Sequence, residues 1–297
     1  MKKLLSIAAC MAALSATAQI DSAQLLKDVQ TLSADKMEGR RTGTKGNRMA
    51  QFYLLDRFRE AGLQQFHNTY EQAFFFNSRG SRIMGTNLYG YIKGKVDSFI
   101  VISAHYDHIG TRAQSAGTDS IYNGADDNAS GVAGLLAMAR YFSQRPPKHT
   151  LIFAAFDAEE TGLQGAKDFS ARLPVPAARI ILNINMDMIS HSDKRELYVC
   201  GTYHYPFLKP FINTVAAGSP IRLLTGHDRP EDGGNDWTGQ SDHHVFHLRK
   251  IPFLYFGVED HPDYHKVTDE FSTIHPSFFY QAARSVLEVV KKIDERG

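Results

Sequence analysis

Six carboxylate or imidazole side chains in this sequence are of the types that bind metal ions and activate water. Five of them can ligate a metal, and each lies where a predicted core strand runs out into a loop: His105, Asp126, Glu160, Asp187 and His265. Donors of these types suit zinc, with cobalt or manganese as second choices. Glu159 adjoins Glu160, and neighbouring side chains leave a strand in different directions. The set therefore predicts a hydrolytic centre with two Zn²⁺ per chain and Glu159 as general base.

Two further acids are expected to orient the histidine ligands. Asp107 lies two residues after His105, a spacing that lets its carboxylate accept the second N–H of the imidazole. Asp269 follows His265 by four residues and is the corresponding partner there. Such contacts fix the tautomer and raise the basicity of a ligand histidine.

Alternating strand and helix patterns supply the framework for these residues. Apolar runs predict strands at 84–93, 98–105, 150–157, 179–188 and 251–257, and helices are expected at 45–62, 129–143, 162–171, 206–217 and 277–293. This alternation predicts a three-layer α/β/α fold with a mostly parallel mixed central sheet. Sites in such sheets collect at the carboxyl ends of the strands, which is where the metal-capable residues occur.

Several motifs of this chain together resemble the di-zinc exopeptidases, a family that includes bacterial leucyl-type aminopeptidases and aminopeptidase Y. The motifs AHYDH, GADDNASG, AEETGLQG, NMD and HPDYHKVTD occur in the family's order and rough spacing. The N-terminal stretch MEGRRTGTKGNRMAQFYLLDRFREAGL is also similar to the family's opening helix and its approach. The resemblance covers nearly the whole chain and implies a zinc-exopeptidase-like fold.

Carried over motif by motif, the resemblance implies a role for each ligand. Asp126 would bridge both metals, His105 and Asp187 would complete one site, and Glu160 and His265 would complete the other. Glu159 would be the general base. The family also has a cis non-proline peptide within its paired acids, which is expected here between Asp126 and Asp127.

Other residues near these motifs are expected at the substrate pocket. Tyr264 would add a hydrogen bond to the oxyanion, as the equivalent residue does in some relatives, or would pack the loop. Trp237 would contact a substrate side chain or anchor a solvent-exposed loop, while Asp242 and His243 would border the pocket or cap a short helix. The remaining histidines are expected in surface or packing roles, His108 among them.

The charge pattern bears on which end of a peptide the site would take. Binding of a free α-ammonium needs an acid, and four are conceivable: Glu159, Asp187, Asp242 and Glu259. A carboxypeptidase would instead need a basic residue, and only Lys266 adjoins a ligand motif. The sequence therefore favours an aminopeptidase acting on peptide substrates, mainly through the resemblance.

The N-terminus predicts export. Lys2 and Lys3, an apolar run from Leu4 to Leu14 and an Ala-Thr-Ala triplet fit a signal peptide over residues 1–18, followed by one catalytic domain over residues 19–297. The protein is thus expected to be secreted or periplasmic, with lipid attachment at Cys10 as a minority alternative. The apolar run is too short to span a membrane, so no integral membrane segment is expected.

Composition limits the other classes of function. The chain has 297 residues, 43% of them hydrophobic, which is enough for one substantial core. Without residues 1–18 it carries 31 basic and 32 acidic side chains, a balance that favours no nucleic acid partner. Only Cys200 would then remain, so no internal disulfide is available. Composition leaves the oligomeric state open.

Three functions remain open from the sequence. The first is the exported di-zinc aminopeptidase. The second is a glutaminyl cyclase, which shares the fold but works with one zinc; an intact GADDNASG motif, with Tyr264 instead of a tryptophan, favours the peptidase. The third is a non-catalytic binding domain, which the full set of ligands and Glu159 disfavours.

Overall fold

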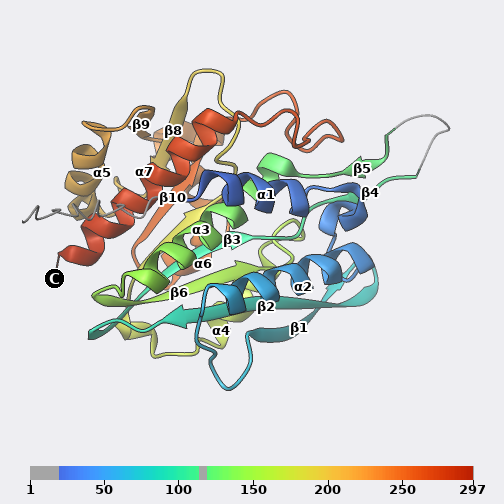
Figure 1. Cartoon of the computed structure of the whole chain (residues 1–297), viewed down its shortest axis with the longest axis horizontal. Helices are drawn as coiled ribbons and strands as arrows, with labels where there is room; N and C mark the ends of the chain where they lie inside the picture. Colours follow the sequence, from blue (N-terminus) through green and yellow to red (C-terminus); the bar gives the residue numbers. More distant parts are fainter. Residues whose placement is uncertain (1–19, 114–118, 297) are drawn as a thin grey trace, which may run out of the picture.

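The computed structural model describes residues 20–113 and 119–296, so the expected signal peptide lies outside the described residues. An eight-stranded sheet forms the centre, with strand order β1-β2-β6-β3-β7-β10-β8-β9 (Figure 1). Its strands are β1 Glu71–Ser78, β2 Ser81–Ile92, β3 Val96–His105, β6 His149–Phe156, β7 Ile180–Met186, β8 Glu196–Cys200, β9 Arg222–Thr225 and β10 Phe253–Gly257. A separate ribbon pairs β4 Gly110–Thr111 with β5 Ile121–Tyr122.

The four central strands run parallel to one another. β3 pairs in parallel with β6 and with β7, and β7 pairs in parallel with β10. The pairs β1–β2, β2–β6 and β8–β10 are antiparallel, while β8–β9 is parallel. The carboxyl ends of β6, β3, β7 and β10 therefore meet along one edge of the sheet.

Helices cover both faces of the sheet (Figure 1). The helices are α1 Ser22–Leu32, α2 Lys45–Glu60, α3 Gly131–Gln144, α4 Gln164–Ala171, α5 Lys209–Ala216, α6 His243–Leu248 and α7 Pro276–Glu295. α1, α2, α3 and α7 share one apolar core with the sheet, and α4 and α6 share a second core on the opposite face. This is the three-layer arrangement that the sequence predicted.

The central strands are mostly apolar because both faces are covered. Along β6, Leu151, Phe153 and Ala155 face the core of α1–α3, while Ile152 and Phe156 face the core of α4 and α6. Every residue of β6 is buried. Such strands read as continuous apolar runs in the sequence, and this is why they were predictable.

The five predicted strands correspond to β2, β3, β6, β7 and β10, and the five predicted helices correspond to α2, α3, α4, α5 and α7. The predicted helix 206–217 begins with a short helical turn, Pro206–Leu208, before α5. β1, β8, β9 and α1 were not predicted. In the described part of the chain, no helix combines the length and apolar character that crossing a membrane requires.

Candidate metal centre

Three of the five candidate ligands lie at the ends of the central parallel strands. His105 is the last residue of β3, Asp187 directly follows β7, and Glu160 lies in the turn after β6. These strands are neighbours in the sheet, so their carboxyl ends bring the three side chains together. His105 Nε2 lies 3.1 Å from Asp187 Oδ1, and both side chains are nearly inaccessible to solvent.

Asp127 lies between two groups of these side chains. Its Oδ1 is 3.4 Å from Nε2 of His105, on the side of Asp187. Its Oδ2 is 3.0 Å from Nε2 of His265, on the side of Glu160. The carboxylate thus directs one oxygen to each group, which is the arrangement a carboxylate shared by two metal ions requires.

The second group contains one histidine more than the sequence predicted. His265 Nε2 lies 3.4 Å from Glu160 Oε2, and His108 Nδ1 lies 2.8 Å from Glu160 Oε1 and 3.6 Å from Asp127 Oδ2. His108 is buried, and its Nε2 has no hydrogen-bond partner among the described residues. His108 was expected in a surface or packing role; it is buried, and its ring belongs to this group of possible ligands.

The structure corrects the position of Asp126. Its Oδ1 accepts hydrogen bonds from the backbone N–H and the hydroxyl of Ser190, at 2.6 and 2.7 Å, and its Oδ2 faces Nε2 of His261 at 3.0 Å. The side chain is fully buried in this separate network and is turned away from His105 and Glu160. Asp127, the next residue, occupies the shared position that the resemblance gave to Asp126.

The backbone at the paired acids also differs from the expectation. The cis peptide joins Asp127 to Asn128, one bond later than predicted. The carboxylate of Asp269 accepts the N–H of Asp126 at 2.9 Å and that of Asp127 at 3.0 Å. Asp269 therefore holds this turn, and no contact with His265, its predicted partner, is found among the described residues.

Asp107 connects two of the strand ends. Its carboxylate accepts the backbone N–H groups of Glu159 at 3.0 Å and of Glu160 at 3.3 Å. His105 Nδ1 lies 3.2 Å from the Asp107 carbonyl oxygen and 3.7 Å from its carboxylate. Asp107 thus contacts the His105 ring as predicted, with its carbonyl closer than its carboxylate, and it also holds the turn that carries both glutamates.

The two adjacent glutamates have opposite electrostatic surroundings. Burial raises the pKa of Glu159 well above its ordinary value, an effect that the nearby carboxylates of Asp242 and Asp187 reinforce. Burial and Asp127 also act to raise the pKa of Glu160, but hydrogen bonds from His108 and His265 outweigh them and lower it to about 2. Glu160 therefore stays ionised and can act as a metal ligand, whereas Glu159 readily holds a proton. The two neighbouring residues are thus suited to different chemical roles.

A buried arginine compensates for this concentration of acids. Arg40 is fully inaccessible to solvent and donates hydrogen bonds of 2.6–2.9 Å to four backbone carbonyls, those of Leu32, Tyr106, Asn123 and Gly124. Burial lowers its pKa to about 10, against the attraction of Asp127 and neighbouring acids. Arg40 therefore remains charged at neutral pH and ties the end of α1 to the loops that follow β3 and β5.

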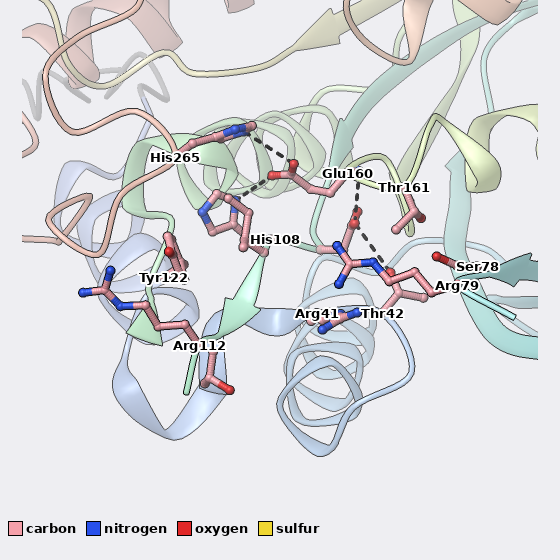
Figure 2. Close-up of a pocket in the computed structure, with 13 residues that line it drawn as sticks. Arg41, Thr42, Ser78, Arg79, His108, Arg112, Tyr122, Glu160, Thr161 and His265 are labelled. Atoms are coloured by element: carbon pink, nitrogen blue, oxygen red, sulfur yellow. Dashed lines mark hydrogen bonds and ion pairs between the residues drawn. The ribbon is translucent and has the colours of Figure 1, made fainter. Parts of the chain in front are cut away.

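Two cavities adjoin the centre. The smaller, of about 70 Å³, is lined by Glu159, Asp187, Asp260, Trp237 and Tyr264 together with several of the candidate ligands. The larger, of about 680 Å³, lies on the side of Glu160, His108 and His265 (Figure 2). Glu160 and His265 line both cavities, so these two ligands separate them.

The predicted substrate-binding residues divide between the cavity and the core. Trp237 lines the small cavity and stacks on His227 with ring centroids 3.8 Å apart. Tyr264 also lines it, and its ring lies 4.0 Å from that of His265. Asp242 and His243 are fully buried and line neither cavity.

The carboxylate of Asp242 is buried close to the site. Neither of its oxygens has a hydrogen-bond partner among the described residues, and burial raises its pKa to about 8. Of the four acids considered for an ammonium group, Glu159 and Asp187 line the small cavity, whereas Glu259 pairs with His227 at 3.0 Å. Asp260, the residue after Glu259, was not predicted and also lines the small cavity.

Solved structures of known proteins share this fold. A zinc aminopeptidase from Bacillus subtilis, BSAP, superimposes with a TM-score of 0.75 at 17% identity, covering 94% of this chain and 97% of that chain. A glutaminyl cyclase from Porphyromonas gingivalis gives a TM-score of 0.76 at 18% identity, covering 93% of this chain and all of that chain, 100%. At these identities the likeness defines a fold class, the three-layer α/β fold of zinc-exopeptidase type.

Comparison of sequences then identifies the family. The profile of Peptidase family M28 matches residues 87–290, and the chain belongs to this family. Aminopeptidase YwaD of Bacillus subtilis is 29% identical over 251 residues, which cover 78% of this chain and 50% of that protein. The chain spans half or less of the length of the curated relatives it matches first. Membership in the family confirms the resemblance drawn from the motifs.

Proposed function

We propose that this protein is a two-zinc aminopeptidase that hydrolyses the N-terminal bond of peptides. The position of Asp127 carries this proposal, because its two carboxylate oxygens face two separate groups of ligands. His105 and Asp187 would complete one metal site, and Glu160 and His265 would complete the other. Asp107, Asp269 and His108 would keep these ligands in place.

The donors of both groups fit zinc. Each group combines imidazole nitrogen with carboxylate oxygen, and His105 is oriented so that Nε2 faces the site while Nδ1 faces a backbone carbonyl. A histidine held in this way presents an unprotonated nitrogen to a metal. Zinc, when bound, would lower the pKa of a nearby water to about 7 and supply positive charge for the developing oxyanion.

Glu159 would be the general base in this reaction. Its backbone N–H is held by Asp107 at 3.0 Å, and it lines the small cavity next to the ligands. In that position its carboxylate would accept a proton from the attacking water and deliver it to the leaving amine. Tyr264, which lines the same cavity, would donate a hydrogen bond to the oxyanion.

The small cavity supports action at the amino end. It carries the carboxylates of Glu159, Asp187 and Asp260, and the last of these belongs to neither group of ligands. An α-ammonium would be attracted to this side, with Trp237 beside the first side chain of the peptide. Its volume of about 70 Å³ favours small or medium side chains in the absence of rearrangement.

A variant of Glu159 separates catalysis from metal binding. Glu159→Gln should keep the zinc content of the wild type and lose at least about 100-fold in kcat on a leucyl-arylamide, the usual contribution of a positioned base. Glu231→Gln, an exposed glutamate in the loop before Trp237, serves as the matched control. Full activity in Glu159→Gln with zinc retained would overturn the assignment of the base.

A glutaminyl cyclase is the second candidate, favoured by the close likeness of the fold to the Porphyromonas gingivalis enzyme. It would need one zinc and would release ammonia from an N-terminal glutamine as the ring closes. The complete first group of His105, Asp127 and Asp187 argues for the peptidase instead. Formation of pyroglutamate from a glutaminyl peptide, followed by mass spectrometry, would favour the cyclase. The gathered ligands also argue against a non-catalytic binding domain.

We also propose that the protein is exported, as the sequence of residues 1–18 predicts. Expression of the full chain with mass analysis of the product tests this directly. The expected N-terminus is Gln19, whereas a product carrying lipid on Cys10 would indicate an anchored protein.

A further inference from the structure

The larger cavity beside the centre carries three arginine side chains. Arg41 follows the short helical turn Asp35–Arg40, Arg79 lies in the turn between β1 and β2, and Arg112 follows β4. All three line the same cavity as Glu160 and His265, and Figure 2 shows them on the side away from His265. They come from separate parts of the chain, so no single motif brings them together.

These arginines have no carboxylate partner in the parts of the chain that the structure describes. Arg112 donates a hydrogen bond to the carbonyl of Asp119 at 3.1 Å and lies over the ring of Tyr122. On the nearby helix α2, by contrast, Arg57 and Arg59 pair with Asp28 and Asp56. Guanidinium groups that face a hollow and lack a carboxylate are suited to bind a carboxylate from a ligand.

The acids that line this cavity are already engaged. The carboxylate of Asp107 accepts the N–H groups of Glu159 and Glu160, and Glu160 is held by His108 and His265. Among the described residues, neither acid forms an ion pair with any of the three arginines. The cavity volume of about 680 Å³ lies within the range of roughly 300–1,000 Å³ that is usual for small-ligand pockets.

The two cavities have opposite charge. The small one carries Asp260 and Asp187, and the large one carries the three arginines, with Glu160 and His265 between them. A short peptide has the same polarity, with an ammonium at one end and a carboxylate at the other. Each extended residue adds about 3.5 Å, so a few residues beyond the cleaved bond would reach into the larger cavity.

We propose that Arg41, Arg79 and Arg112 bind a carboxylate in the leaving part of the substrate, so that short peptides with an anionic group beyond the cleaved bond are preferred. This inference rests on the proposed function, because it takes the centre as the place of cleavage. In the sequence only Lys266 adjoins a ligand motif, whereas these arginines reach the cavity from other parts of the chain. The chain remains an aminopeptidase in this account, with the arginines selecting the part of the peptide that leaves.

Binding to an inactive variant tests the inference independently of turnover. Leu-Gly-Gly and its C-terminal amide would be titrated by calorimetry into zinc-loaded Glu159→Gln protein. The free acid should bind at least about tenfold tighter than the amide, as expected for charge-assisted hydrogen bonds. This preference should shrink with added salt. Equal affinity of the acid and the amide, together with equal affinity of Leu-Gly amide and Leu-Asp amide, would overturn the inference, whatever the protein hydrolyses.

Substitutions then assign the preference to the arginines. Arg41→Ala, Arg79→Ala and Arg112→Ala, each made in the Glu159→Gln background, should each reduce the ratio of acid to amide affinity by about threefold or more. Lysine at the same positions should restore part of it. Arg82→Ala is the matched control. Arg82 lies at the start of β2, close in the chain to Arg79; it contacts the ring of Phe75 and does not line the cavity. An unchanged ratio in all three arginine variants would contradict the proposal.

Two further comparisons show which carboxylate of the peptide binds in the larger cavity. Leu-Gly amide and Leu-Asp amide differ only in a side chain, so tighter binding of the second would place a side-chain carboxylate in the site. Tighter binding of Leu-Gly than of Leu-Gly amide would place the terminal carboxylate there, and either result supports the arginine site. Hydrolysis of leucyl-arylamide by the wild type is measured separately, because its failure would count against the peptidase and not against the arginines.

Discussion

Asp269 accepts the backbone N–H of Asp127 at 3.0 Å, and its other oxygen accepts that of Asp126 at 2.9 Å. One buried carboxylate thus fixes the turn that presents Asp127 to both groups of ligands. Burial together with Asp126 raises the pKa of Asp269 to about 7, against the lowering effect of these two hydrogen bonds. The direction of the Asp127 carboxylate therefore depends on a residue 142 positions later in the chain.

Replacing Asp269 with asparagine should weaken the centre without removing a ligand. The amide would turn an N–H donor toward a backbone N–H, so the free energy of unfolding should fall by about 1–3 kcal/mol. Zinc affinity should fall by about 10- to 100-fold, as is usual when a group that orients ligands is lost. Urea unfolding of the metal-free protein and competition with a chromogenic chelator measure the two effects. Wild-type zinc affinity in this variant would contradict the orienting role.

Asp126 and Asp127 should respond differently to the same substitution. Asp127→Asn should lose both ions, with metal content falling below one zinc per chain after dialysis. Asp126→Asn should retain two zinc ions and lose about 1–3 kcal/mol of stability, because its carboxylate accepts the hydroxyl and the backbone N–H of Ser190. Elemental analysis of both variants compares them. The reverse pattern would restore Asp126 as the shared ligand.

Removing the buried guanidinium of Arg40 should destabilise the protein strongly. Arg40→Met removes the guanidinium donor from four backbone carbonyls, of which only that of Gly124 keeps a second donor, the N–H of Ala129, among the bonds described, and it removes a charge that offsets the acids of the centre. A loss of at least about 3 kcal/mol is expected, which would lower the Tm by roughly 6–12 °C for a chain of this size. Arg59→Met is the control, since the surface pair of Arg59 with Asp56 should contribute less than about 1 kcal/mol. Similar Tm values for the two variants would contradict the role of Arg40.

His243 should make the protein sensitive to acid. Burial lowers its pKa to about 3, and its Nε2 lies 3.0 Å from the carbonyl of Trp237. The unfolded chain therefore binds a proton near pH 6.5 that the folded protein does not bind. The contribution of His243 to the free energy of unfolding is fully present above pH 6.5 and is lost as the pH falls below it. The contribution is about 1.4 kcal/mol per pH unit between the two pKa values.

The pH series is done by urea unfolding of metal-free protein, so that zinc binding does not add its own pH dependence. His243→Gln keeps a donor for the Trp237 carbonyl and has no imidazole to protonate. Its free energy of unfolding should therefore fall less steeply between pH 6.5 and 4.5 than that of the wild type. Parallel curves for the two proteins would show that His243 does not titrate as its burial requires.

The central strands were predictable because of the way they are covered. β3, β6 and β7 are packed on both faces, which produces the long apolar runs seen in the sequence. β1 lies at the edge of the sheet and alternates between buried and exposed positions, while β8 and β9 have only five and four residues. Short or half-exposed strands give a weaker signal, so these three were missed, whereas β10, also of five residues, is buried along its whole length and was predicted.

The errors at the site have a common cause in the backbone. Asp126 and Asp127 are identical side chains at adjacent positions, and the choice between them depends on the turn at Ala125–Ser130, where Asp127 and Asn128 leave helical geometry. The spacing of residues in the motif does not predict this backbone conformation, so it could not distinguish Asp126 from Asp127. The second histidine of AHYDH was an available signal for His108, since a residue three positions beyond a strand end can return to the same edge. The three arginines come from distant turns that only the folded chain brings together.

Zinc content measured together with turnover tests the central claim most directly. The purified chain without residues 1–18 would be analysed for zinc and assayed with leucyl-arylamide and with a glutaminyl peptide, before and after removal of metal with a chelator. We expect close to two zinc ions per chain and arylamide hydrolysis that is lost with the metal and restored by zinc. One zinc per chain with pyroglutamate formation and no arylamide hydrolysis would contradict it.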